Sequence, residues 1–152
     1  MIKKKDREII NHLRQNSRQK LTEISQKTGM PITTIFDRIR ECERLVIKKH
    51  TCIVDFSRFG YNSISHIAFK INKGHFDEAK SFLSEHPSVN SLYRINNNYD
   101  FLVEVVFSNH AEIKDFLNYL KYMGAKNIAS FNHIDELKKE DFMFSKHIWD
   151  ST

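Results

Sequence analysis

Apolar residues in the first 45 positions recur every three or four residues, as they do on the buried face of a helix. Asn16-Ser17 and the run Thr28-Gly29-Met30-Pro31 interrupt this pattern. Gly29 can adopt a positive φ, and Pro31 suits the first turn of a helix. The pattern therefore predicts three short helices, of which the last two form a helix-turn-helix. Their apolar positions are Ile9, Ile10 and Leu13, then Leu21 and Ile24, then Ile35, Ile39 and Cys42.

The stretch from Val46 to Asp55 is rich in β-branched residues and has Lys48 and Lys49 near its middle. It predicts a strand or hairpin with a basic tip, a wing that would lie along a phosphate backbone. Residues 56–61 are predicted to form a hinge into a second domain.

From residue 64 the apolar residues alternate between segments of strand spacing and segments of helical spacing. Strand spacing covers residues 64–71, 89–95, 99–107 and 126–137, and helical spacing covers 76–86 and the segment from Asn109 to Gly124. The run Asn96-Asn97-Asn98 predicts a turn between the second and third strands, since asparagine tolerates left-handed conformations. The order β-α-β-β-α-β predicts a ferredoxin-like, ACT-like domain and so an α+β chain. Alternation over Phe142–Ile148 predicts one more short strand, with Trp149 buried against it or against a partner subunit. The expected domains are 1–55 (winged helix-turn-helix), 56–63 (hinge) and 64–152 (ferredoxin-like).

Charge divides the chain at about the same place. The protein has 152 residues, 24 Lys+Arg and 19 Asp+Glu, a net charge of +5. Residues 1–50 hold 13 of the basic residues and 6 of the acidic ones, a net +7, whereas residues 51–152 hold 11 and 13, a net −2. One end is therefore expected to meet a polyanion while the other does something else.

The predicted third helix supplies candidates for contact with double-stranded DNA. With Ile35, Ile39 and Cys42 facing inward, hydroxyl groups stand at its entry and arginines follow one turn later, which suits a helix that enters the major groove N-terminus first. Phe36 lies beside that face, either half-buried at its flank or against a thymine methyl group. The expected DNA-binding residues are Lys20, Thr33, Thr34, Asp37, Arg38, Arg40, Lys48 and Lys49.

The remaining chemistry argues against an enzyme. The chain has no G-x-x-x-x-G-K, G-x-S-x-G or H-E-x-x-H motif, and its two cysteines, Cys42 and Cys52, form no C-x-x-C pair. Of its eight histidines only His66 and His133 fall on strands that would be neighbours, and two imidazoles without a third ligand make a poor zinc site. We expect no cofactor and no metal. A charged N-terminus and the absence of any long apolar run lead us to expect a cytoplasmic, nucleoid-associated protein with no membrane partner.

The two-domain pattern resembles the Lrp/AsnC, or feast/famine, family of transcription regulators. The resemblance covers nearly the whole chain and rests on matches in order and spacing. These are Asp6, Ile9, Ile10, Leu13, Arg18, Glu23-Ile24-Ser25, Gly29, Arg38-Ile39-Arg40, Glu43, Ile47-Lys48-Lys49-His50-Thr51, Val54-Asp55, Phe59-Gly60-Tyr61, Tyr99-Asp100-Phe101-Leu102, Gly124 and Asp135-Glu136-Leu137-Lys138.

The resemblance implies a DNA-binding transcriptional regulator whose second domain forms homodimers, often assembled into octamers, and binds an amino acid or related metabolite between dimers. On this sequence the effector site maps to Asn97, Asn98, Asp100 and Ser130. An amide, a carboxylate and a hydroxyl can together hold an ammonium and a carboxylate group. The same residues are equally suited to be turn residues and a strand hydroxyl satisfied by the backbone.

Two alternatives remain open. One is an architectural protein that coats DNA with little sequence preference. The other is an enzyme, because siroheme decarboxylases resemble the same layout and carry a Val-Thr-His-Asn-Tyr-x-Arg type run. Here that run reads Val89-Asn90-Ser91-Leu92-Tyr93-Arg94, which keeps the tyrosine and arginine but has Ser91 in place of the histidine.

Overall fold

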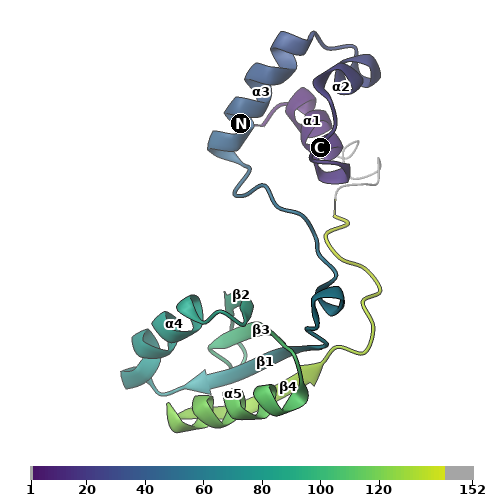
Figure 1. Ribbon diagram of the computed structural model, residues 1–152. Coiled ribbons are helices and arrows are strands. Elements are labelled where there is room, and N and C mark those ends of the chain that lie inside the picture. Colours follow the sequence, from purple (N-terminus) through teal and green to yellow (C-terminus); the bar gives the residue numbers. More distant parts are fainter. Residues whose placement is uncertain (1, 143–152) are drawn as a thin grey trace. The chain divides into compact units, whose positions relative to one another are not determined.

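The computed structural model describes residues 2–142, and its chain forms two compact units (Figure 1). The helical unit comprises residues up to Ile53 together with the segment that begins at Lys138, and the sheet unit comprises Val54–Leu137. The chain therefore leaves the helical unit, builds the sheet unit and then returns to the helical unit.

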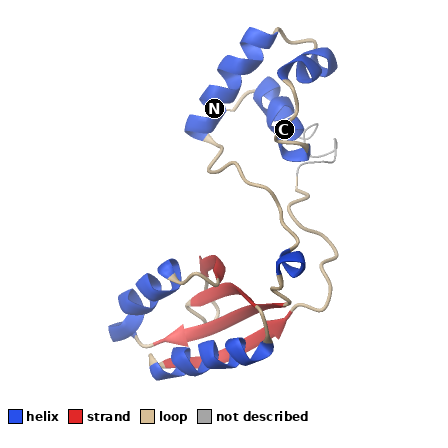
Figure 2. Ribbon diagram, viewed as in Figure 1, coloured by secondary structure: helices blue, strands red, loops and turns tan. Residues whose placement is uncertain are grey.

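Three helices make up the helical unit: α1 (Lys4–Gln15), α2 (Leu21–Thr28) and α3 (Ile32–Leu45) (Figure 2). All three were predicted from the apolar spacing and are confirmed. Ile9, Ile24, Met30 and Ile35 are buried together at their centre, so each helix contributes to one small core.

The turn between α2 and α3 is fixed by local hydrogen bonds. Gly29 has φ +68° and its N–H donates to the Ser25 carbonyl at 2.8 Å, the left-handed helix ending that glycine adopts at least cost. The Ser25 hydroxyl donates to the Met30 carbonyl at 2.6 Å. These bonds set the direction in which α3 leaves the turn.

The strand or hairpin predicted from Val46 to Asp55 is absent from the structure. Residues 47–55 contain no strand and run extended from the end of α3 to a 3₁₀ turn at Phe56–Phe59. The segment has no Gly, Asn or Asp pair at its middle to close a tight hairpin, and an isolated two-stranded hairpin is only marginally stable. The turn lies within the predicted hinge and is capped by Asp55, whose carboxylate accepts the Ser57 N–H at 3.1 Å.

The sheet unit has the predicted β-α-β-β-α-β order, which confirms the ferredoxin-like arrangement. Its four strands form an antiparallel sheet in the order β2-β3-β1-β4, and both helices lie on one side of it (Figure 1). The elements are β1 (Ser63–Ile71), α4 (Phe76–Glu85), β2 (Val89–Arg94), β3 (Phe101–Phe107), α5 (His110–Tyr122) and β4 (Ala125–Asn132).

Alternation along the strands separates two faces of this sheet. One face packs beneath α4 and α5 and is apolar, with Phe69 and Val103 fully buried on it and Leu120 of α5 almost fully buried in the same core. The other, which we call the open face, carries no helix of the sheet unit. It is formed by Ile64, His66, Ala68, Ser91, Tyr93, Leu102, Glu104, Val106, Ala129 and Phe131.

The last strand is shorter than predicted. β4 ends at Asn132 and not at residue 137. Its neighbour β1 begins at Ser63, so beyond Asn132 it offers β4 little more than the Ile64 carbonyl, which accepts the His133 N–H at 2.9 Å. A strand that continued would have no neighbour to bond. The strand predicted around residues 142–148, with Trp149, lies outside the described residues except for Phe142.

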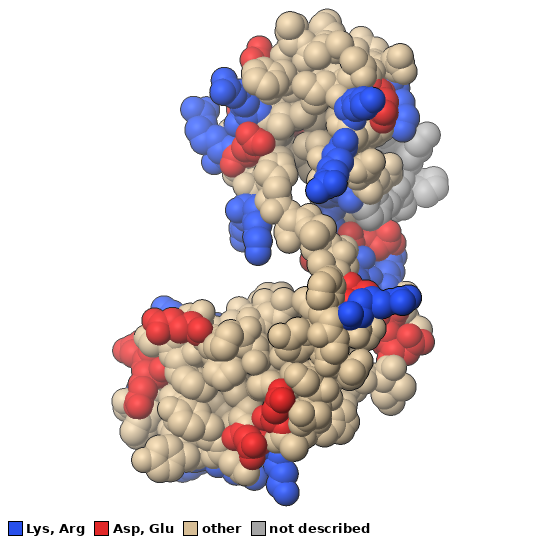
Figure 3. Space-filling view, in the orientation of Figure 1, with Lys and Arg blue, Asp and Glu red and all other residues tan. Residues whose placement is uncertain are grey.

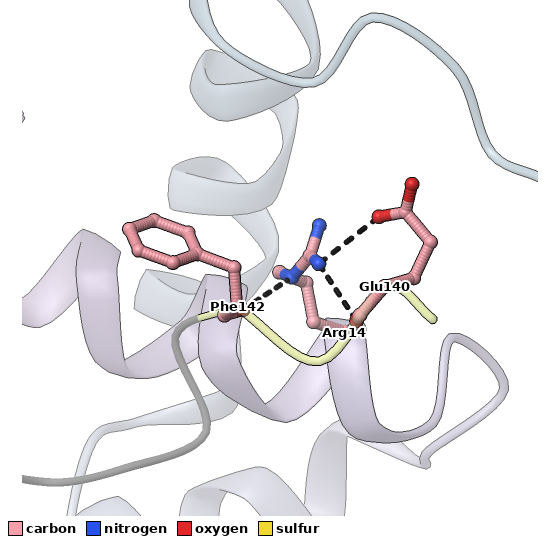
Figure 4. Close-up of polar contacts among 3 residues, drawn as sticks. All are labelled: Arg14, Glu140 and Phe142. Carbon is pink, nitrogen blue, oxygen red and sulfur yellow. Dashed lines mark hydrogen bonds and ion pairs between the residues drawn. The ribbon is translucent and has the colours of Figure 1, made fainter. Parts of the chain in front are cut away.

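Residues 138–142 pack on the helical unit, although the sequence analysis placed them in the second domain. Arg14, in the last turn of α1, holds this segment (Figure 4). Its guanidinium donates to the Glu140 carbonyl at 2.9 Å, the Glu140 carboxylate at 3.1 Å and the Phe142 carbonyl at 3.1 Å. One guanidinium thus satisfies three acceptors of this segment.

Candidate nucleic-acid interface and effector region

The outward face of α3 presents the side chains that suit a DNA groove. Thr33, Asp37 and Arg40 are exposed, whereas Thr34 is half-buried. The Arg40 guanidinium lies over the Phe36 ring, 5.1 Å from its centroid, and Phe36 is 47% exposed. This cation–π contact holds an exposed arginine against the helix surface.

Arg38 is placed differently from the other candidates on α3. Its Nη1 lies 3.4 Å from Oδ1 of Asp6, a residue of α1 that is only 4% exposed, and 3.3 Å from the Glu41 carboxylate. The other Asp6 oxygen accepts the Lys3 N–H at 2.8 Å. A buried carboxylate needs such a partner, so Arg38 ties α1 to α3 and does not extend freely from the helix.

The predicted phosphate contacts come from two places. Lys20 is exposed at the start of α2, and Lys48 and Lys49 are exposed in the extended segment after α3. That segment is held to the end of α3, because the N–H groups of Val46 and Ile47 both donate to the Cys42 carbonyl at 2.8 Å. On the face shown in Figure 3, Lys and Arg gather over the helical unit and acidic groups stand out on the sheet unit.

Two residues predicted to bind the effector, Asn97 and Asn98, form a tight turn between β2 and β3. Asn97 and Asn98 are exposed and have φ +57° and +70°. Two successive left-handed residues characterise the turn that matches the twist of an antiparallel hairpin, and asparagine tolerates them best after glycine. Both amides are therefore displayed at one end of the sheet.

Asp100 and Ser130 are not adjacent within one chain. The Asp100 carboxylate accepts the Ile71 N–H at 2.9 Å, where β1 ends. Ser130 is exposed on β4 opposite Ile67. Two strand spacings and about three residues of rise separate them, roughly 14 Å. One chain thus brings Asn97, Asn98 and Asp100 together and leaves Ser130 apart.

The histidine pair anticipated from the strand order is present on the open face. The His133 Nε2 and His66 Nδ1 lie 2.8 Å apart and the two rings stack. Among the described residues no group of three or more His, Cys, Asp or Glu side chains is arranged to hold a metal ion. No helix in residues 2–142 is both long and apolar enough to cross a bilayer.

Ser91, which stands where the decarboxylases have a histidine, has a structural role. The Ser91 hydroxyl donates to the Glu104 carboxylate at 2.8 Å, and the Asn90 amide donates to the same oxygen at 3.0 Å. Glu104 is 6% exposed, so these two donors from β2 satisfy a buried charge on β3.

Comparison with known families decides what this arrangement belongs to. Residues 2–45 match a model described as winged helix-turn-helix DNA-binding, and residues 66–141 match the Lrp/AsnC ligand binding domain. The chain belongs to the Lrp/AsnC family. It is a DNA-binding transcriptional regulator with an effector-binding domain, and its relatives point to a protein that is not an enzyme.

Individual Lrp/AsnC relatives agree in sequence and in fold. The HTH-type transcriptional regulator FL11 of Pyrococcus horikoshii is 35% identical over 114 residues, 74% of this chain and 76% of that protein. The regulator NMB0573 of Neisseria meningitidis, solved in complex with L-Met, superposes with a TM-score of 0.83 at 17% identity over 91% of this chain and 94% of that one. LrpC of B. subtilis superposes with a TM-score of 0.82 at 19% identity, over 91% of this chain and 98% of that one.

Sequence reasoning missed two contacts of this Lrp/AsnC chain. The Asp6–Arg38 pair joins two helices, and an acidic residue in an N-terminal helix is more simply explained by the helix dipole. The Arg14–Glu140 contact joins residues 126 positions apart, and no local pattern signals it. The run of Asn97 and Asn98, in contrast, did predict its turn.

Proposed function

We propose that this Lrp/AsnC regulator recognises a specific double-stranded DNA sequence through the outward face of α3. The observation that carries the proposal is the contrast on that helix: Arg40 is displayed over Phe36 at the surface while Arg38 is bound to Asp6. In this scheme Thr33 and Arg40 contact base edges, with Thr34 and Asp37 beside them, and Arg38 positions the helix.

In this proposal the exposed lysines neutralise the DNA phosphates. Lys20, Lys48 and Lys49 flank α3 in the chain, and none of them is buried. Contacts of this kind add affinity without sequence preference and make it strongly dependent on salt. Such a regulator acts at the nucleoid.

The protein acts as a homodimer formed through the open face of the sheet. Tyr93 on β2 is 56% exposed and Phe131 on β4 is 62% exposed, and on this face the two rings flank the apolar side chains of β1 and β3. Two large aromatic rings on an uncovered sheet face favour a partner, and a two-fold partner would present two copies of α3 to a pseudo-palindromic site. Assembly of such dimers into octamers is part of the same proposal.

An amino acid or related small metabolite modulates the regulator at the β2–β3 turn. Asn97, Asn98 and Asp100 supply amides and a carboxylate from one copy, and Ser130 contributes from another because one chain keeps it apart. The effector changes activity only if it binds one assembly better than another. The match to the Lrp/AsnC ligand binding domain supports this role.

A salt-titrated gel shift tests DNA recognition. The purified full chain is mixed with its own upstream region or with random DNA of equal length, at salt concentrations from 50 to about 300 mM. A complex on the upstream region that survives random competitor and weakens steeply with salt is expected. Equal affinity for both DNAs, or uniform protection of long DNA in a footprint, contradicts specific recognition and favours an architectural role.

A further inference from the structure

A hollow of about 350 Å³ opens between α4, α5 and the end of β3, away from the turn assigned to the effector. It is lined by Phe82, His86, Phe107, Glu112, Asp115, Phe116 and Tyr119. Phe107 ends β3 and Asp100 precedes its start, so the hollow and the β2–β3 turn lie roughly 20 Å apart at opposite ends of that strand. The hollow is shallow and largely open to solvent, and its volume lies at the lower end of the range of small-molecule sites.

Aromatic rings make up most of the lining. Phe82 and Tyr119 have ring centroids 4.6 Å apart, His86 and Phe116 meet edge to face at 5.1 Å, and Phe107 lies 5.7 Å from Phe116. Tyr119 is 45% exposed, so its ring borders the mouth of the hollow. Such ring faces attract a cation within about 6 Å of their centroids.

The charges in the lining have one sign. Glu112 is fixed at the start of α5, where its carboxylate accepts the Ser108 N–H at 3.1 Å and the Asn109 amide at 3.0 Å. Asp115 is exposed one turn later. None of the described lining residues is Lys or Arg. An anion, or the carboxylate of an α-amino acid, would meet two carboxylates here without a positive partner.

His86 adds no positive charge to the lining. Its Nδ1 accepts the Ser88 N–H at 3.1 Å, which leaves the proton on Nε2. Burial lowers the pKa of His86 below its ordinary value, so the ring is neutral at pH 7. It acts in this wall as one more aromatic surface.

We propose that this hollow, formed by an aromatic wall with Glu112 and Asp115 at its edge, binds a small organic ammonium ion on an aliphatic arm. The alkyl arm contacts the rings of Phe82 and Phe116. The ammonium group lies between the Tyr119 ring and the Asp115 carboxylate, where cation–π and ionic attraction act together. The site is independent of DNA recognition by α3, so either proposal can fail alone.

Isothermal titration calorimetry on the full chain tests the proposal with two probes of equal shape. The probes are n-pentylammonium and the neutral 1-pentanol. The ammonium is expected to bind about fivefold more tightly, and the difference shrinks at high salt. Equal binding of the two probes, or no binding of either, overturns the proposal.

Variants locate the binding. Asp115→Asn is expected to weaken the ammonium about threefold and leave the alcohol unchanged, because the amide keeps the shape and removes the charge. Tyr119→Leu should have the same selective effect through loss of the ring face. Asp77→Asn, which removes an exposed charge in the first turn of α4, is the matched control and should change neither probe. If Asp115→Asn behaves like Asp77→Asn, the ammonium binds elsewhere and the assignment is wrong.

Discussion

The two sides of α3 carry the same type of side chain in two different settings. On one side the Arg38 guanidinium meets the buried Asp6 carboxylate of α1 at 3.4 Å. On the other, two residues later, Arg40 lies over the Phe36 ring at the surface. One arginine is used to hold the helix in place and the other is left available to a ligand.

The contrast shows that positive charge on a recognition helix does not by itself identify a DNA contact. A guanidinium paired with a buried carboxylate must lose that partner before it can reach a base, and the loss leaves a buried charge uncompensated. In the proposed scheme recognition depends on both sides, because the displayed arginine is useful only when the helix beneath it is fixed. The following changes separate the two roles.

Arg38→Ala is expected to produce the largest change, a loss of about 2 kcal/mol in the unfolding free energy of the helical unit. The substitution leaves the buried Asp6 carboxylate without its guanidinium. Urea unfolding followed by circular dichroism at 222 nm measures the loss. Arg40→Ala is the matched control, and equal unfolding of the two variants would refute a structural role for Arg38. Adding Asp6→Asn to Arg38→Ala should restore part of the stability, because the amide carries no charge.

Lys48→Ala combined with Lys49→Ala tests the phosphate contacts next to the displayed side of α3. Removing two contacts should lower the slope of log K against log salt by about 2, with the ratio of specific to random binding unchanged. Binding titrations at four salt concentrations give the slope. Lys126→Ala, an exposed position on β4, should leave it unaltered, and a changed specificity ratio would mean that these lysines contact bases.

Phe36→Leu tests whether the ring under Arg40 contributes to DNA binding. Loss of the ring under Arg40 should weaken specific binding about twofold, consistent with a surface cation–π contact of about 0.5 kcal/mol. The effect should vanish in an Arg40→Ala background, since the ring then has no guanidinium to hold. An equal effect in both backgrounds would show that Phe36 contacts DNA on its own.

His86→Gln should have the smallest effect and none on either side of α3, because His86 lies in the sheet unit. Burial lowers the pKa of His86 in the folded protein below its ordinary value of 6.5. Between the pKa of the folded protein and that of the unfolded chain, the unfolded chain binds more protons. The contribution of neutral His86 to stability is therefore present above pH 6.5 and is lost as the pH falls through the folded pKa.

The comparison for His86 uses the change in Tm between pH 7.5 and 5.5. The wild type should lose about 2 °C more than His86→Gln over this interval. If the two proteins lose the same amount, His86 is not held neutral by the fold.

Much of the architecture follows from local patterns. Helical spacing of Ile9, Ile24 and Ile35 predicted the helices, because a three-helix core needs one apolar stripe from each. Asn97 and Asn98 predicted their turn, since few other residues tolerate a positive φ. The meeting of His66 and His133 followed from strand order alone.

The remaining features depend on distant parts of the chain. The segment after Val46 has strand composition but no strand partner, so composition misled the prediction of a wing. The burial that sets Arg38 apart from Arg40 depends on Asp6, 32 positions before Arg38, which no local pattern reveals. The return of Glu140 to Arg14 reflects a contact between the ends of the chain, which no local pattern encodes.

The most direct test of the account is the ratio of affinities for the upstream region and for random DNA, measured at one salt concentration for the wild type and for Arg40→Ala. Loss of a displayed base contact should reduce specific affinity about tenfold and leave random binding nearly unchanged, so the ratio falls by the same factor. An unaltered ratio, with Arg40→Ala folded as the wild type, would contradict the assignment of the outward face of α3 as the surface that reads DNA.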